Sequence, residues 1–152
     1  MAERAVARAP LSPLSAGEQQ LPKDLGAYLV RVLRLRAGDE LVLFDPEAGT
    51  EARAEVLRDV PTIVRIAEPR VALRASLRDV TLLQGLAKGD KPEHVLRAAV
   101  ALGASSVTFV RTERSVAGAE LRLERLRAVM IDTARQCGRA ELPKLGGLAS
   151  LN

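Results

Sequence analysis

The sequence predicts two small domains in 152 residues, a compact β-barrel of the α+β class and then an α/β domain with a parallel sheet. Three short apolar runs, separated by turn residues, follow one helical segment in the first half. A strand, a helix, a second strand and a second helix occupy the second half, as in a β-α-β unit. We therefore expect domains at residues 1–72 and 73–152.

The first 22 residues are rich in Ala, Pro and Ser without a clear period, and we expect an irregular arm there. A short helix follows, because apolar residues are spaced for one helical face, and it ends near Ala37 and Gly38. The residues of that face are Leu25, Leu29, Val32 and Leu33.

Three short strands are expected next, and their sequences are ELVLFD (40–45), EARAEVL (51–57) and TIVRIAE (62–68). In the second run small apolar residues alternate with Arg53 and Glu55, as in a strand with one buried face. Short strands at close spacing around one small helix predict the barrel.

The second half predicts a parallel sheet. The run VTLLQGL (80–86) is continuously apolar, which favours a strand buried on both faces. A helix follows in KPEHVLRAAVAL, with Gly103 placed to end it, and SSVTFV is the next strand. The apolar positions spaced for one face of that helix are Val95, Ala98, Ala99 and Leu102.

A longer helix is expected at about 120–137, and Gly138 is placed to end it. Its apolar stripe comprises Leu123, Leu126, Met130, Ala134 and Cys137, which predicts that Cys137 is packed. The segment PKLGGLASLN supplies at most one further short strand. A parallel sheet needs more strands to cover both faces and form a ligand crevice, so we expect an incomplete α/β domain in this chain.

Charge favours a polyanionic partner such as RNA. The net charge is +4, and residues 76–152 carry the surplus, with twelve Lys and Arg against eight Asp and Glu. The three aromatic residues, Tyr28, Phe44 and Phe109, do not support a stacking platform for single-stranded bases. Any recognition of RNA is therefore expected to rest on shape, phosphate and backbone contacts.

Single residues exclude several classes of site. Cys137 is the one cysteine and His94 the one histidine, which excludes an internal disulfide and a multi-cysteine metal site. Zinc chemistry and a Ser-His-Asp triad are disfavoured for the same reason. We expect no metal, and a solvent-facing His94. No apolar run approaches the length of a membrane span, and the N-terminus lacks an apolar signal, so a cytoplasmic location without a membrane partner is expected.

Two loops and one helix end concentrate polar residues, and each has two interpretations. In QGLAKGDKPEHV, Asp90 caps a helix with Pro92 in its first turn, or Lys88 and Lys91 bind a ligand or RNA. In VRTERSV, the charges pair with one another, or two arginines clamp a phosphate. In QCGR, Arg139 caps the carbonyl groups at the end of its own helix, or it serves a site.

Three blocks, in order, resemble the RsmE family: VRVLRLRAGDELVLFD, LLQGLAKGDKPEHVLRAAVALGASSVTFVRTERSV and DTARQCGRAELPKL. The resemblance implies a PUA-like RNA-binding β-barrel, followed by the first half of a SPOUT-type α/β domain. It also implies a homodimer that methylates N3 of a uridine in 16S ribosomal RNA, in the small ribosomal subunit, with S-adenosylmethionine. DNA is not expected as a partner.

The resemblance also implies roles for particular residues. By resemblance, Arg31 and Arg34 are expected to contact RNA, and Lys88 and Lys91 are expected to do so from their position in the loop between a strand and a helix. The residues expected to line the catalytic cleft are Arg114, Gln136 and Arg139. The family's glycine-rich knot, which forms most of the cofactor pocket, has no counterpart here, so the cofactor-binding residues are unknown and the 152-residue chain alone is expected to be inactive. The alternatives are a non-catalytic RNA-binding or dimerisation protein derived from this family, or a plain interaction domain.

Overall fold

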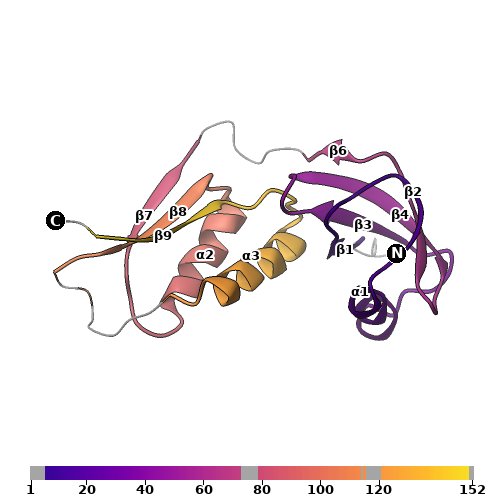
Figure 1. Cartoon of the computed structure of the whole chain (residues 1–152), viewed down its shortest axis with the longest axis horizontal. Coiled ribbons are helices and arrows are strands. Elements are labelled where there is room, and N and C mark those ends of the chain that lie inside the picture. Colours follow the sequence, from indigo (N-terminus) through magenta and orange to yellow (C-terminus); the bar gives the residue numbers. More distant parts are fainter. Residues whose placement is uncertain (1–5, 73–78, 114, 116–120, 151–152) are drawn as a thin grey trace, which may run out of the picture. The chain divides into compact units, whose positions relative to one another are not determined.

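The computed structural model describes residues 6–72, 79–113, 115 and 121–150. The chain divides into two compact units, Met1–Ala72 and Leu73–Asn152. Each unit has its own sheet and its own helices (Figure 1). None of the helices in these ranges is long and apolar enough to cross a membrane.

The N-terminal unit is built on a six-stranded sheet with β3, β4 and β5 at its centre. These strands are Glu40–Asp45, Thr50–Arg58 and Ile63–Ile66, they pair antiparallel, and all three were predicted. The strands around them are β1 (Ala7–Pro10), parallel to β3, and β2 (Gly17–Gln20) and β6 (Arg70–Val71), antiparallel to β5 and β4. The path of pairings between described residues ends at β1 and β2.

Strands β1 and β2 lie where the sequence predicted an irregular arm, and that prediction is wrong. β1 alternates over only three residues before a proline, and β2 reads Gly-Glu-Gln-Gln, so neither carries a strong strand signal. Each forms because another strand offers an edge, β3 for β1 and β5 for β2. Such pairing depends on tertiary context, which a local pattern does not report.

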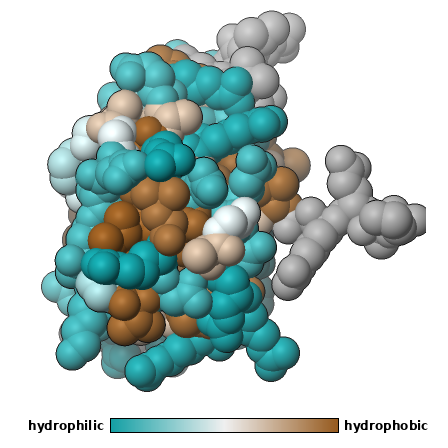
Figure 2. Space-filling view, turned by 90° about the vertical axis from the view of Figure 1, so that its right-hand side faces the viewer, coloured by the Kyte–Doolittle hydropathy of each residue, from teal (hydrophilic) through white to brown (hydrophobic). Residues whose placement is uncertain are grey.

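The core of the N-terminal unit lies between the sheet and the helical segment. In β4, Ala52, Ala54 and Val56 are buried while Arg53 is exposed, so the predicted alternation is confirmed. Figure 2 looks onto this unit and shows small apolar patches separated by hydrophilic residues. Fully buried members of the core include Leu29, Leu41, Leu43 and Val64.

The helical segment is shorter than predicted and changes type. α1 (Lys23–Ala27) passes directly into a π-helix, η1 (Tyr28–Val32), in which the Leu33 N–H donates to the Tyr28 carbonyl at 3.1 Å. A π-helical turn contains an extra residue, which shifts later positions off the predicted face, and Val32 is 64% exposed. Arg34 then adopts a left-handed φ of 58°, so the helix ends before Gly38.

The C-terminal unit is a three-stranded parallel sheet in the order β7-β8-β9. The strands run in one direction and crossover connections are right-handed, which places both helices on the same face (Figure 1). The predicted β-α-β unit, second helix and one further strand are all present. In chain order they are β7 (Thr81–Gly85), α2 (Lys91–Leu102), β8 (Ser106–Arg111), α3 (Leu123–Cys137) and β9 (Lys144–Ser150).

Three predictions about burial in this unit are wrong. α2 buries Leu96 and Val100 beside Ala99, whereas Leu102 is 81% exposed; α2 is apolar on several sides, so its period does not select one face. β7 is not buried on both faces, because the described helices cover one face and Leu83 is 63% exposed. Cys137 is exposed because it is the last residue of α3, beyond the buried part of the stripe.

Glycines end both helices, as predicted. Gly103 and Gly138 follow α2 and α3 with φ of 83° and 80°, a region that other residues rarely adopt. A third glycine serves close packing: a Cβ on Gly146 would collide with the side chain of Thr108 on the adjacent strand. The Gly-Gly sequence therefore lets β9 pair along the whole of β8.

Candidate functional site

The carboxyl end of the parallel sheet carries the first candidate residues. The loop Lys88-Gly89-Asp90 follows β7, and Lys91 is the first residue of α2. Gly89 has a φ of 69°, which glycine adopts without strain, and the chain turns there from strand to helix. Lys88 and Lys91 are exposed, and neither forms an ion pair within the described part of the chain.

Asp90 occupies the N-cap position of α2, but its side chain makes no capping hydrogen bond. Its backbone is right-handed helical (φ −87°, ψ 0°), whereas a capping side chain needs a more extended backbone. The predicted side-chain cap is therefore wrong, although Pro92 lies in the first turn as expected. The Asp90 carbonyl accepts from the His94 N–H at 3.1 Å, but the Asp90 side chain offers no acceptor to the N–H groups of this helix end.

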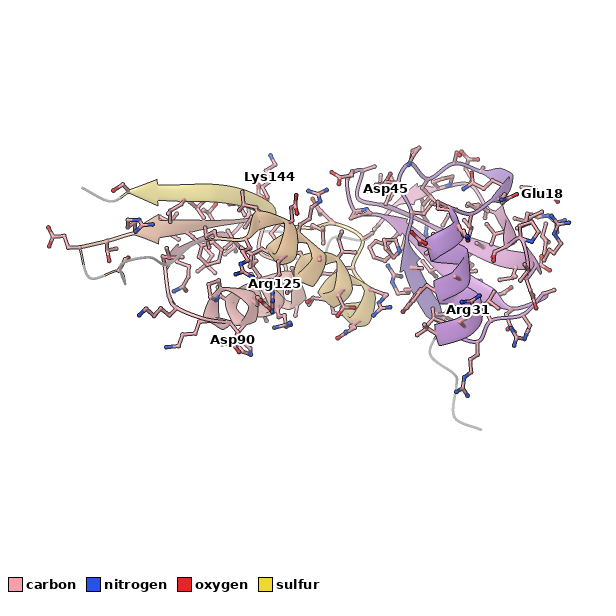
Figure 3. All side chains as sticks on the ribbon, turned by 60° about the horizontal axis from the view of Figure 1, so that its bottom comes forward. Glu18, Arg31, Asp45, Asp90, Arg125 and Lys144 are labelled. Carbon is pink, nitrogen blue, oxygen red and sulfur yellow. The ribbon has the colours of Figure 1, made fainter. Side chains whose placement is uncertain are left out.

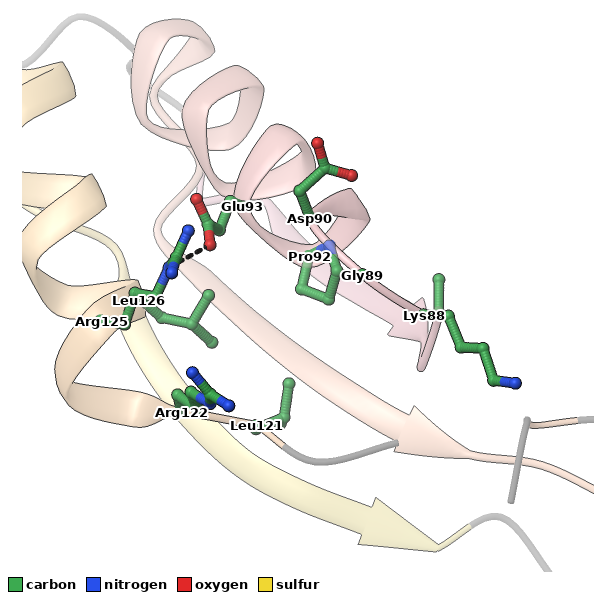
Figure 4. A pocket seen from close by; sticks show the side chains of 10 residues that line it. Lys88, Gly89, Asp90, Pro92, Glu93, Leu121, Arg122, Arg125 and Leu126 are labelled. Carbon is green, nitrogen blue, oxygen red and sulfur yellow. Dashed lines mark hydrogen bonds and ion pairs between the residues drawn. The ribbon is translucent and has the colours of Figure 1, made fainter. Parts of the chain in front are cut away.

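A cavity of about 410 Å³ opens between the amino ends of α2 and α3 (Figure 4). One side comes from the loop after β7 and the first turn of α2, and the other from the start of α3. The residues that matter for its chemistry are Lys88, Asp90, Glu93, Arg122 and Arg125.

Glu93 joins the two helices beside this cavity. Its side chain is 12% exposed and accepts a hydrogen bond from Arg125 Nε on α3 at 2.5 Å (Figure 4). Arg97, one turn further along α2, lies 3.5 Å from the same carboxylate. One negative charge therefore serves two guanidinium groups.

The loop after β8 forms a compact turn. The Thr112 N–H donates to Ser115 Oγ at 2.8 Å, and the Ser115 N–H donates to the Thr112 carbonyl at 2.9 Å. Arg111 and Glu113 are exposed. Arg114, one of the three candidate catalytic residues, lies outside the described residues.

Gln136 and Arg139 lie at and just beyond the carboxyl end of α3. Gln136 is exposed, and its amide donates to Asp132 Oδ2 at 2.8 Å. Arg139 Nη2 donates to the Ala101 carbonyl at 3.2 Å, and its guanidinium fills the space beside Gly103 that a Cβ would need. The side chain of Arg139 therefore caps α2, because Gly138 turns the chain out of α3. The backbone N–H of Arg139 donates to the Ala134 carbonyl of its own helix at 2.9 Å.

The structure places Lys88 and Lys91 close together and separates them from Gln136 and Arg139. α3 has 15 residues, so its ends are about 22 Å apart at a rise of ~1.5 Å per residue. The lysines lie where β7 leads into α2, and the other pair lies where α3 leads back towards the start of β9. Within one copy of the unit, these residues do not form a single site.

Arg31 and Arg34 belong to the N-terminal unit, and both are exposed. Figure 3 shows Arg31 on the helical segment. Arg31 is in η1 and lines a cavity of about 390 Å³ whose apolar lining includes Val30 and Val60. Arg34 is held in a left-handed conformation, which costs a non-glycine residue free energy and is often found at functional positions.

Arg122, Arg125 and Glu93 were not predicted as site residues. The i, i+3 spacing of the two arginines at the start of a helix was a visible signal, but it is common on solvated helices. Their proximity to Lys88 depends on α2 and α3 lying side by side. In the described residues, no group of three His, Cys, Asp or Glu could hold a metal ion.

Comparison with known proteins gives two family matches. A family model described as an RNA methyltransferase domain matches residues 74–152, and one described as an RNA methyltransferase PUA domain matches residues 21–59. The first match covers more than half of the chain. The resemblance indicated by the three sequence blocks is thereby confirmed.

Two solved structures are similar over almost the whole chain. The ribosomal RNA small subunit methyltransferase E of Neisseria gonorrhoeae, bound to S-adenosylmethionine, has 25% identity and a TM-score of 0.80. A methyltransferase of Legionella pneumophila, solved with the same cofactor, has 26% identity and a TM-score of 0.78. Each match covers 95% of this chain and 63% of the other, so this chain spans less than two thirds of these relatives. The fold is a PUA-like domain followed by part of a SPOUT-like parallel sheet.

Proposed function

Since the chain belongs to the RNA methyltransferase family, we propose that it is part of an enzyme that methylates N3 of a uridine in 16S ribosomal RNA, with S-adenosylmethionine as the methyl donor. The domain match over residues 74–152 carries this proposal. Similarity to a ribosomal RNA small subunit methyltransferase supports the substrate class. The activity is proposed for the whole protein.

In this proposal each of the two units contributes its own contacts with RNA. The N-terminal unit binds RNA through Arg31 and Arg34, which lie in and directly after the helical segment. The C-terminal unit contributes Lys88 and Lys91 from the carboxyl end of its sheet, the edge where open α/β sheets bind ligands. These four cations are exposed and have no ion-pair partner within the described ranges, which suits contacts with the phosphate backbone.

The reaction moves a methyl group from a sulfonium sulfur to uracil N3, and the N3 proton leaves to a base. Bound S-adenosylmethionine supplies the electrophilic methyl group. The described cavity does not fit that cofactor, because Lys88 and Arg122, which have no ion-pair partner among the described residues, would repel a positively charged sulfonium. We therefore assign RNA positioning, and no step of methyl transfer, to the residues around this cavity.

We further propose that the enzyme acts as a homodimer. Gln136 and Arg139 lie at the opposite end of α3 from the proposed RNA contacts at Lys88 and Lys91. In a symmetric dimer, the end of α3 in one copy can lie beside the carboxyl end of the sheet in its partner. Gln136 and Arg139 would then reach the target base from the other copy.

Transfer of tritiated methyl groups to unmethylated small ribosomal subunits tests the activity. The protein from its native source should label 16S RNA, and reverse transcription should stop at the product, because a methyl group on N3 blocks base pairing. The 152-residue chain should neither bind the cofactor tightly nor transfer methyl groups. Efficient transfer by this chain alone would contradict the proposed division of labour.

One observation favours a second function, a non-catalytic RNA-binding or dimerisation protein derived from this family. Arg139 already caps α2 and Gln136 is bonded to Asp132, so the two candidate catalytic residues that the structure describes have structural partners. In that case the native protein should bind RNA in a salt-sensitive way and show no cofactor binding by calorimetry. Cofactor binding by the native protein would exclude this alternative.

A further inference from the structure

The cavity between α2 and α3 is lined by positively charged side chains that have no partner among the described residues. Lys88 and Arg122 both line it, and neither has an ion-pair or side-chain hydrogen-bond partner in the part of the chain that the structure describes. Arg122 directly precedes α3, and Figure 4 shows its guanidinium on the α3 side, across the cavity from Gly89 and Pro92.

The two carboxylates that line the cavity do not cancel this charge. Glu93 is engaged by Arg125 and Arg97. The side chain of Asp90 is 70% exposed, lies 3.8 Å from His94 Nδ1, and points away from Arg122 in Figure 4. Arg122 therefore lines the cavity with no counter-ion among the residues that the structure describes.

We propose, resting on the function proposed above, that this cavity binds a phosphate group of the RNA backbone, with Arg122 as its main ligand and Lys88 at its rim. A guanidinium offers two parallel N–H groups that match a phosphate, and a lysine adds a mobile point charge. Glu93 is a positioning residue, because its bond to Arg125 fixes the start of α3, which carries Arg122. The uncapped amino end of α2 adds a favourable potential.

The lining favours a phosphate over a base. The described residues around the cavity include no aromatic side chain on which a base could stack. The volume of about 410 Å³ lies within the usual range for small ligand sites and leaves room for a phosphate with its ribose. The site would therefore read the backbone and not the sequence of the RNA.

Salt-dependent binding tests this proposal. The probe is a fluorescein-labelled single-stranded RNA, titrated with the 152-residue chain by anisotropy at several salt concentrations. The slope of log K against log salt is negative, and each lost phosphate contact should reduce its magnitude by about 0.7. Removing both ligands of this one phosphate in R122Q/K88Q should therefore reduce the magnitude of the slope by about 0.7. R122Q alone should lose most of that amount, because Arg122 is the main ligand, and R122K should lose little of it.

The matched control is K144Q, which removes one exposed positive charge at the amino end of β9 (Figure 3). It should leave the slope unchanged. E93Q should lower affinity without lowering the number of phosphate contacts, so the curves shift and stay parallel. Circular dichroism of every variant separates loss of binding from loss of folding.

The outcomes separate this inference from the function on which it rests. RNA binding with an unchanged slope in R122Q/K88Q would overturn the phosphate site and leave the proposed function standing. No RNA binding by the unmodified chain at low salt would overturn both. A second measurement uses inorganic phosphate, which should shift the amide resonances of Gly89, Asp90, Lys91 and Glu93 in the unmodified chain but not in R122Q. Equal shifts in both proteins would also overturn the site.

Discussion

The arginines at the two ends of the small parallel sheet differ in their interaction partners. At the amino end, Arg139 donates to the Ala101 carbonyl and lies against Gly103, so its guanidinium stabilises the fold. At the carboxyl end, Arg122 has no ion-pair partner within the described residues and faces a cavity. An arginine near a predicted site is therefore weak evidence of function until its partners are known.

The strongest test of this comparison is a pair of glycine substitutions at the two helix ends. Gly103 and Gly138 have nearly the same left-handed φ, but a Cβ at Gly103 meets the Arg139 guanidinium, whereas a Cβ at Gly138 meets no atom within 4 Å. G138A should lower the free energy of unfolding by about 1 kcal/mol from backbone strain alone. G103A should lower it by about 2 kcal/mol, because Arg139 must also move.

Urea denaturation of both variants measures this difference. If G138A and G103A were equally destabilised, Arg139 would contribute little to the packing at the end of α2. When G103A is added to R139A, it should lower the free energy of unfolding by no more than G138A does in the unmodified chain.

Removing each arginine gives the next largest effect. R139A should lower the free energy of unfolding by about 1.5 kcal/mol, since a charge-assisted hydrogen bond to a helix-terminal carbonyl is lost. R122A should change it by less than about 0.5 kcal/mol, because no partner is left unsatisfied. Thermal unfolding of the two variants compares them directly, and a larger loss in R122A would reverse the assignment of structural and binding roles.

Glu93 should have a smaller effect on stability. E93Q keeps the shape of the side chain but removes the charge that serves Arg97 and Arg125, and we expect a loss of about 1 kcal/mol because both arginines are largely exposed. The control is E124Q, an exposed glutamate in the first turn of α3. The E93Q loss should shrink in high salt, and a salt-independent loss would indicate a packing effect.

The smallest effect is expected at Cys137. C137S should change the free energy of unfolding by less than about 0.5 kcal/mol, because the side chain is exposed at the end of α3. Rapid reaction of the native protein with a thiol reagent checks the same exposure. Slow reaction together with a large loss of stability would restore the packed role that the sequence predicted.

Local patterns predicted the strands and helices whose own residues carry the signal. The alternation in β4 and the glycines after α2 and α3 act over a few residues, and the corresponding elements were placed correctly. β1 and β2 were missed because their strand character comes from neighbours distant in sequence. The same limit explains Leu83: a continuous apolar run does not report how many faces of the sheet are covered.

The candidate site residues, too, were predicted where the signal is local and missed where it depends on packing. Lys88 and Lys91 were predicted as RNA contacts, because a loop between a strand and a helix lies at the carboxyl end of a parallel sheet. Arg122 was missed because its relation to that loop depends on how α2 and α3 pack. The hypothesis that Gln136 and Arg139 belong to the catalytic cleft came from family resemblance, and spacing in one chain does not test it.

The π-helix at Tyr28–Val32 makes the helical segment sensitive to the deletion of a single residue. A π-helical turn is equivalent to an α-helical turn that has gained one residue, and its hydrogen bond runs from the Leu33 N–H to the Tyr28 carbonyl. Deleting one codon within it would restore ordinary helical spacing but rotate every later residue of the segment by about 100°. Leu35, which is buried, would leave the core, so an in-frame deletion that improves local geometry should be purged by selection.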